Sequence, residues 1–140
     1  MLKVHEWTIA TNIVDSMVNY AKTSGVKILG VKVYIGEMTL VDRRILANAI
    51  KSMLKRFNMS CSVRTIIVEA KFKCESCGHV WRFSEVKDKV LREAQLIGED
   101  PPFHYISSLI YPFMTCPKCG SYDYKIVSGK TIEYKVIVEG

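Results

Sequence analysis

The chain has 140 residues, of which 49% are hydrophobic and 24% charged, so it can pack a core and wholesale disorder is excluded. No apolar run approaches the about 18 residues that a bilayer-spanning helix needs, and the first residues lack the apolar stretch of a signal peptide. We therefore expect a cytoplasmic protein with no membrane partner. The formal net charge of +6 leaves nucleic-acid binding open at this point.

The first third of the chain is predicted to form a helix followed by a strand. The predicted helix has an apolar face about five turns long, and Gly25 suits the left-handed cap position that ends it. Residues 27–35 are predicted to form a half-buried strand, in which Val31, Val33 and Ile35 alternate with Lys32 and Tyr34. The face of the helix consists of Trp7, Ala10, Ile13, Val14, Met17, Val18 and Ala21.

Residues 42–57 are predicted to form a second helix, with Asp42 as its N-cap. Its polar side carries Arg43, Arg44, Lys51, Lys55 and Arg56, which form either a solvated face or a docking surface for an acidic partner. The predicted buried stripe is Ile45, Leu46, Ala49, Ile50, Met53, Leu54 and Phe57.

Two later segments have the alternation of strands, residues 63–72 and residues 131–138. Two amphipathic helices need a sheet of more than two strands to cover. The predicted fold class is therefore α+β, with two helices on a three-stranded sheet and an inserted zinc-ribbon-like domain. We expect the helix–sheet domain to span residues 1–72 and 122–140, and the inserted domain residues 73–121, with a helix capped by Ser84.

The inserted segment contains two copies of the pattern C-x-x-C-G. They are Cys74-Glu-Ser-Cys77-Gly and Cys116-Pro-Lys-Cys119-Gly. A two-residue gap lets both sulfurs of one turn reach the same metal ion, and four thiolates suit tetrahedral Zn²⁺. Redox dithiols are the alternative interpretation. Four cysteines fill the coordination sphere, so we expect a structural zinc rather than a catalytic one, and no enzyme activity.

Several segments occur together in an order that closely resembles the HypA family, the nickel metallochaperones of NiFe-hydrogenase maturation. The resemblance covers nearly the whole chain. The two C-x-x-C-G motifs correspond to zinc knuckles, and the long insertion between these knuckles is similar to that of archaeal members. The segments that carry it are HEWTIATNIV at the start, VYIGEMTLVD after the first strand, the two knuckles, and CPKCGSYDYKIVSGKTIEYKVIVE at the end.

The resemblance implies a nickel domain with an N-terminal Met-His-Glu site, and a zinc domain. Carried over, His5 would bind Ni²⁺ as cargo with Glu6 in support, and Cys74, Cys77, Cys116 and Cys119 would bind zinc. By itself, a histidine beside a glutamate is usually a solvated pair at a helix start. The resemblance also implies a HypB-type GTPase as a partner and delivery to the hydrogenase large subunit.

The position of His5 departs from the family pattern, in which the histidine is the second residue. Ni²⁺ favours a square-planar site of nitrogen ligands. An imidazole, the α-amine and the deprotonated amides between them can supply such a site when the histidine is the second residue. Either translation starts at position 4, or nickel uses His5 with amides and another side chain. His104 in the insertion is a candidate extra nickel ligand, the alternative being a surface or packing histidine.

Two other function classes stay open. The net charge and the knuckles would also fit a zinc-ribbon module that binds nucleic acid or protein, although the basic residues are not gathered in the knuckles with aromatic residues between them. A zinc enzyme would need an open coordination position and a general base. We therefore favour a metallochaperone with no nucleic-acid partner, as a monomer or a weak or domain-swapped dimer.

Overall fold

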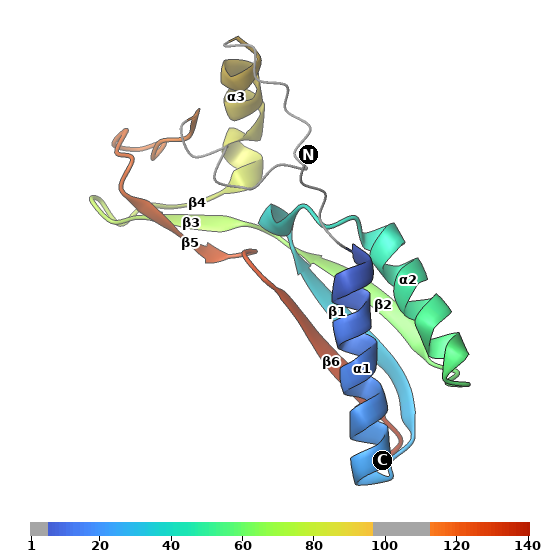
Figure 1. Cartoon of the computed structure of the whole chain (residues 1–140). Helices are drawn as coiled ribbons and strands as arrows, with labels where there is room; N and C mark the ends of the chain where they lie inside the picture. The colour runs from blue at the N-terminus through green and yellow to red at the C-terminus, as the bar shows by residue number, and fades with distance from the viewer. Residues whose placement is uncertain (1–5, 97–112) are drawn as a thin grey trace. The chain divides into compact units, whose positions relative to one another are not determined.

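The computed structural model in Figure 1 describes residues 6–96 and 113–140 of the chain. Contacts between residues divide it into two compact units. The α/β unit contains residues 6–35, 41–67 and 132–140 of the described chain, and the cysteine unit contains residues 36–40, 68–96 and 113–131. No helix of the described segments is long and apolar enough to span a membrane.

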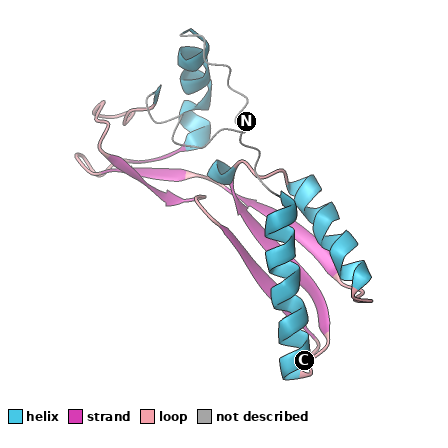
Figure 2. Cartoon of the chain, viewed as in Figure 1, coloured by secondary structure: helices cyan, strands magenta, loops and turns pink. Residues whose placement is uncertain are grey.

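The α/β unit consists of two long helices on a three-stranded sheet, as Figure 2 shows. The strand order is β2-β1-β6, and β1 pairs with β6 in antiparallel register, Val33 opposite Tyr134. This arrangement confirms the predicted α+β class. The elements are α1 (Glu6–Ser24), β1 (Ile28–Gly36), α2 (Arg43–Arg56), β2 (Ser62–Val68) and β6 (Ile132–Val138).

The core of this unit lies between the helices and the sheet. Most of the predicted apolar residues are buried there, but Trp7, Ile45 and Phe57 are about half exposed, at 51%, 46% and 49%. Trp7 is in the first turn of α1, and Phe57 follows the last residue of α2. Ile45 is one position, about 100°, away from the buried Leu46, which turns its side chain to the edge of the stripe. Their predicted burial was therefore wrong.

The local signals at the helix ends are confirmed. The Asp42 side chain accepts hydrogen bonds from the backbone N–H groups of Arg44 (2.9 Å) and Ile45 (3.1 Å), as an N-cap does. Gly25 has a φ of +71°, and its N–H donates to the carbonyl of Ala21. Glycine suits this position because it has no Cβ, so a positive φ there costs little strain.

The cysteine unit contains a second three-stranded sheet in the order β4-β3-β5, with both pairs antiparallel. Its core is aromatic, because Phe72 stacks against Trp81 with ring centroids 5.8 Å apart and meets Tyr124 edge-on at the same distance. The elements of this unit are the short helix η1 (Glu37–Thr39), β3 (Lys71–Cys74), β4 (Val80–Arg82), α3 (Phe83–Leu96) and β5 (Tyr124–Ser128).

The single strand predicted for residues 63–72 is wrong, because the chain leaves one sheet and enters another within it. β2 ends at Val68 and β3 begins at Lys71. Ala70 and Phe72 are fully buried in the core of the cysteine unit, whereas Ile66 and Val68 are half-buried residues of β2. The boundary between the units therefore falls before residue 68 and after residue 131, and not at residues 72 and 122.

The start of α3 also differs from the prediction. The helix begins at Phe83, so Ser84 lies inside its first turn and does not cap it. Instead, the carboxylate of Glu85 accepts a hydrogen bond from the backbone N–H of Arg82 at 2.7 Å, as the glutamate of a capping box does. Along this helix, Val90 is buried and Val86 half-buried.

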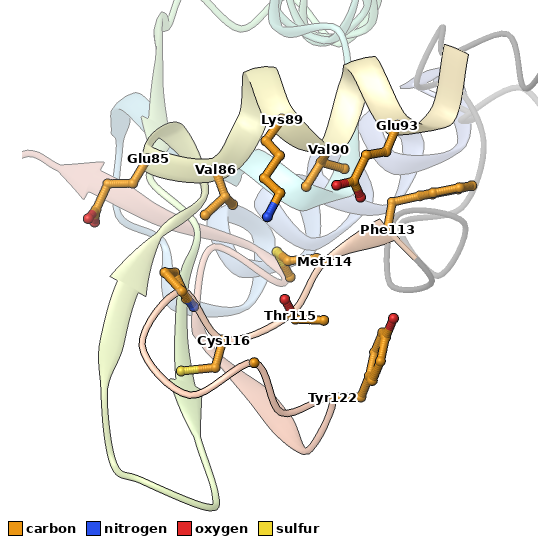
Figure 3. A pocket seen from close by; sticks show the side chains of 12 residues that line it. Glu85, Val86, Lys89, Val90, Glu93, Phe113, Met114, Thr115, Cys116 and Tyr122 are labelled. Atoms are coloured by element: carbon orange, nitrogen blue, oxygen red, sulfur yellow. The ribbon is translucent and has the colours of Figure 1, made fainter. Parts of the chain in front are cut away.

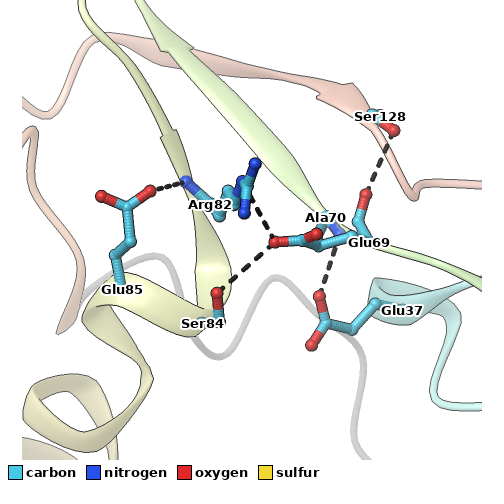
Figure 4. A network of polar contacts seen from close by, with 7 residues as sticks. All are labelled: Glu37, Glu69, Ala70, Arg82, Ser84, Glu85 and Ser128. Atoms are coloured by element: carbon cyan, nitrogen blue, oxygen red, sulfur yellow. Dashed lines mark hydrogen bonds and ion pairs between the residues drawn. The ribbon is translucent and has the colours of Figure 1, made fainter.

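A network of polar contacts joins η1, β4 and α3 to Glu69 and Ala70, which precede β3, inside the cysteine unit (Figure 4). Glu37 accepts a hydrogen bond from the backbone N–H of the buried Ala70, at 2.9 Å. The carboxylate of Glu69 meets Arg82 at 3.5 Å and accepts from the Ser84 hydroxyl at 3.4 Å. The first contact ties the turn after β1 into the unit that holds the cysteines.

Candidate metal centre

The structure brings together the four cysteines of the two knuckles. Their Sγ atoms all lie within 4.8 Å of one another, with 3.5 Å between Cys74 and Cys119 and 3.7 Å between Cys77 and Cys116. Zinc–thiolate bonds of about 2.3 Å in a tetrahedron place sulfurs about 3.8 Å apart. The geometry of this four-cysteine cluster therefore fits a zinc ion.

Each knuckle is a tight turn with the same hydrogen bonds. In the first, the Cys74 N–H donates to the carbonyl of His79 (2.8 Å) and the Gly78 N–H donates back to the carbonyl of Cys74 (3.0 Å). Gly78 has a φ of +79°, which explains the glycine after the second cysteine. The equivalent contacts of the second knuckle join Cys116 to Ser121 (2.9 Å) and Gly120 to Cys116 (2.8 Å), with a φ of +76° at Gly120.

Hydrogen bonds within the knuckles also change the pKa values of three of the thiols. Burial opposes ionisation of Cys74, but hydrogen bonds from backbone N–H groups of its own knuckle, Cys77 first, lower its pKa to about 7. The same balance lowers the pKa of Cys116. A hydrogen bond from the Ser121 backbone favours the Cys119 thiolate, yet the neighbouring thiols, led by Cys74, raise its pKa to about 12. Because thiolates are the metal ligands, binding of a cation by the cluster would displace protons from these thiols.

An aromatic cluster supports the first knuckle. The His79 ring stacks on Trp81 with centroids 6.0 Å apart and an angle of 15° between the ring planes. Trp81 is 1% exposed, and its Nε1 has no hydrogen-bond partner in the parts of the chain that the structure describes. His79 contributes its carbonyl to the knuckle and its ring to this packing, so it has a structural role here.

A pocket of about 570 Å³ lies between α3 and the segment that leads into the second knuckle. Figure 3 shows Lys89 and Glu93 of α3 on one side of it and Thr115 and Tyr122 on the other. The buried ligand candidate Cys116 is part of its wall. The lining of the pocket combines apolar side chains with charges of both signs from α3, and it lies beside the four-cysteine cluster.

The two histidines predicted as nickel ligands, His5 and His104, lie outside the described residues. Glu6 is the first residue of α1 and is half-buried. Its Oε2 accepts a hydrogen bond from the backbone N–H of Asp42 at 2.9 Å. Sequence reasoning identified Asp42 as a helix cap but missed this contact, because no local pattern links residues so far apart in the chain.

Cys61 does not belong to the four-cysteine cluster. It lies in the α/β unit, where its Sγ contacts the carbonyl of Ile28 at 3.5 Å. Burial raises the pKa of this thiol above its ordinary value. Among the described cysteines it is therefore a packed residue rather than a reactive one.

Comparison with known proteins gives one consistent family. The model of the family described as hydrogenase/urease nickel incorporation metallochaperone HypA matches residues 4–138. Proteins named hydrogenase maturation factor HypA from Thermococcus onnurineus and Pyrococcus furiosus are each 37% identical, over 92% of this chain and 91% of their own length. The one from Ignicoccus hospitalis is 32% identical over 98% and 94%.

Solved structures show the same fold. One titled as the solution structure of HypA protein aligns with a TM-score of 0.60 at 17% identity, covering 96% of both chains. The Ni metallochaperone HypA from Helicobacter pylori aligns with a TM-score of 0.54 at 16% identity, covering 95% of this chain and 96% of that one. With a family match over nearly its whole length and a four-cysteine cluster in place, the chain belongs to the HypA family.

Proposed function

We propose that this chain is a nickel metallochaperone that binds Ni²⁺ at its N-terminal His5 with Glu6 and delivers the ion to the large subunit of a NiFe-hydrogenase. The observation that carries the proposal is the family match over residues 4–138, joined by relatives at up to 37% identity that are named hydrogenase maturation factors. The chain acts by transferring an ion rather than by catalysing a reaction.

Zinc has a structural role in this proposal. Cys74, Cys77, Cys116 and Cys119 hold one Zn²⁺, supported by sulfur atoms that lie within 4.8 Å of one another. Four thiolates leave no position for a substrate. The bound ion joins the two knuckles, which are 39 or more residues apart in the chain, and so closes the cysteine unit around its aromatic core.

Partners follow from the proposed role. A HypB-type GTPase works with the chain in the cytoplasm, and the hydrogenase large subunit receives the nickel. The chain works as a monomer or as a weak or domain-swapped dimer. Nickel must leave the site readily, and protonation of the His5 imidazole releases it as the pH falls through about 6.

The test is a titration of Ni²⁺ into two zinc-loaded proteins, the chain as printed and a form that begins Met-His5, followed by visible absorption. A square-planar spectrum with one nickel per chain, in either form, supports the proposal. Binding by the shorter form only means that the α-amine is a ligand, and equal binding means that it is not. If neither form binds nickel, the function proposed here is wrong.

His104 is tested in the same titration as an additional ligand. We expect His104→Ala to weaken nickel binding in whichever form binds the ion, whereas His5→Ala abolishes it. A His104→Ala protein with unchanged nickel affinity and stoichiometry would remove His104 from the site without affecting the proposal for His5.

A further inference from the structure

One face of α2 carries a row of positive charge with no acidic residue near it in the helix. Arg44, Lys51 and Lys55 are exposed, and with Asn48 they follow the spacing of four, three and four residues that places side chains in one line. The row extends over roughly 16 Å of helix. We call these three cations the basic stripe.

The charges of the basic stripe have no balancing carboxylate in an ion pair among residues 6–96 and 113–140. Within the described segments, none of the three cations forms an ion pair with a carboxylate. α2 contains no Asp or Glu in its 14 residues. By contrast, the exposed positions of α3 mix both signs, with Glu85 and Asp88 among Lys87, Lys89 and Arg92.

The placement of these charges works against the stability of the helix. Arg44 lies in the first turn, where the positive end of the helix dipole disfavours a cation. Lys51 and Lys55 are four residues apart, so their like charges repel on the same face. The nearby carboxylates of Asp42 and Glu6 accept hydrogen bonds from backbone N–H groups, which occupies them in capping contacts. These charges therefore do not stabilise the helix.

An apolar residue flanks the stripe. Ile45 follows Arg44 and is 46% exposed, although its neighbours Leu46 and Ala49 are fully buried. An exposed isoleucine beside cations is typical of a surface that binds another protein. In such an interface an apolar side chain is buried against the partner, and the charges around it face charges of opposite sign. Single-stranded nucleic acid would instead require aromatic side chains between the cations, and α2 contains none.

We propose that the basic stripe is a docking surface for an acidic face of a partner protein, with Ile45 at its edge. This inference rests on the proposed function, because a chaperone that hands over an ion must meet a partner. The stripe lies on the helix whose N-cap, Asp42, contacts Glu6 beside the proposed nickel ligand. A partner on this surface is therefore bound close to the start of α1.

The test uses a HypB-type GTPase from the same organism as the probe, with binding rates followed by surface plasmon resonance at 0.05 M and 0.2 M salt. The triple variant R44Q/K51Q/K55Q should bind with an association rate about tenfold lower at low salt and with a weaker salt dependence, while the dissociation rate changes little. The matched control K22Q/K27Q/K135Q removes the same charge from exposed or half-exposed positions elsewhere in the α/β unit.

Equal slowing by the control would mean that net charge, and not the stripe, steers binding, and would overturn the inference. An unchanged association rate in the stripe variant would also overturn it. So would a variant that loses binding to a DNA duplex but binds the GTPase as the parent chain does. Nickel titration of the same variants separates the two proposals, because we expect unchanged nickel binding. A thermal melt at or above that of the parent chain excludes misfolding as the cause.

Discussion

The carboxylate of Glu6 accepts a hydrogen bond from the backbone N–H of Asp42, with 2.9 Å between Oε2 and N. Asp42 in turn uses its own side chain to cap α2. The first turns of α1 and α2 are thus joined by a side chain that was expected to support a metal ion. Glu6 has a structural role in the protein as it stands, whatever it contributes to nickel.

Substitutions of Glu6 should separate these two roles. Glu6→Ala removes the acceptor and should lower the free energy of unfolding by about 1 kcal/mol, because water can partly replace the bond at this accessible site. Glu6→Gln keeps an oxygen acceptor and should change stability by less than about 0.5 kcal/mol. If Gln weakens nickel binding while urea unfolding is unchanged, the carboxylate acts on the metal; equal nickel affinities would assign it to the helix contact only.

Glu37 should matter more for stability than Glu6. Its Oε1 accepts from the N–H of Ala70, a residue with no exposed surface. Glu37→Ala leaves that buried donor without its partner and should destabilise the cysteine unit by about 1–3 kcal/mol. Glu37→Gln, which retains an acceptor, should recover most of the loss. Equal destabilisation by Ala and Gln, measured by urea unfolding, would contradict this account.

Gly129 should tolerate no side chain. It has a φ of +79°, and a Cβ there would lie 2.6 Å from the Cα of Ala70. Backbone strain and the clash together should make Gly129→Ala about 2–4 kcal/mol less stable. Gly25 has a similar φ of +71° but open space around it, so Gly25→Ala should lose only about 1 kcal/mol. Similar losses in the two variants would show that the close approach is relieved elsewhere.

The cysteines should divide into four that hold zinc and one that does not. Cys77→Ser, a change at an exposed position, should abolish retention of about one zinc per chain after dialysis against a weak chelator. Cys61→Ser should retain it, since Cys61 packs against Ile28 in the other unit. Zinc content is measured by atomic absorption. Zinc retained by Cys77→Ser would exclude a four-thiolate site.

Removal of the metal should affect one unit more than the other. After treatment with a strong chelator, we expect hydrogen exchange to accelerate in β3, β4 and β5, whose sheet lies next to the knuckles. Amides of α1, α2 and β1 should keep their protection, because their core consists of apolar side chains from the helices and strands of the α/β unit. Equal acceleration in both units would mean that they unfold as one.

Many structural features of this protein follow from patterns of residues that lie a few positions apart in the sequence. Helical spacing predicted α1 and α2, alternation predicted β1 and β6, and Asp42 and Gly25 were identified at helix ends. The C-x-x-C-G spacing predicted the four-cysteine cluster. Each of these features depends on residues a few positions apart, whose relation is set by backbone geometry that the sequence carries directly. The family resemblance was likewise present in the order of the motifs.

The tertiary structure decided the features that depend on distant residues. Apolar residues recur at every second position from Ile66 to Phe72, so the sequence shows no sign that the chain changes sheets at Glu69 and Ala70, where Gly129, 59 positions further on, makes its close approach. Ile45 is an apolar residue of the predicted stripe, but it is exposed because only one side of α2 packs against the core. Glu6 and Asp42 meet across 36 positions, and only the packing of two helices on one sheet brings them together.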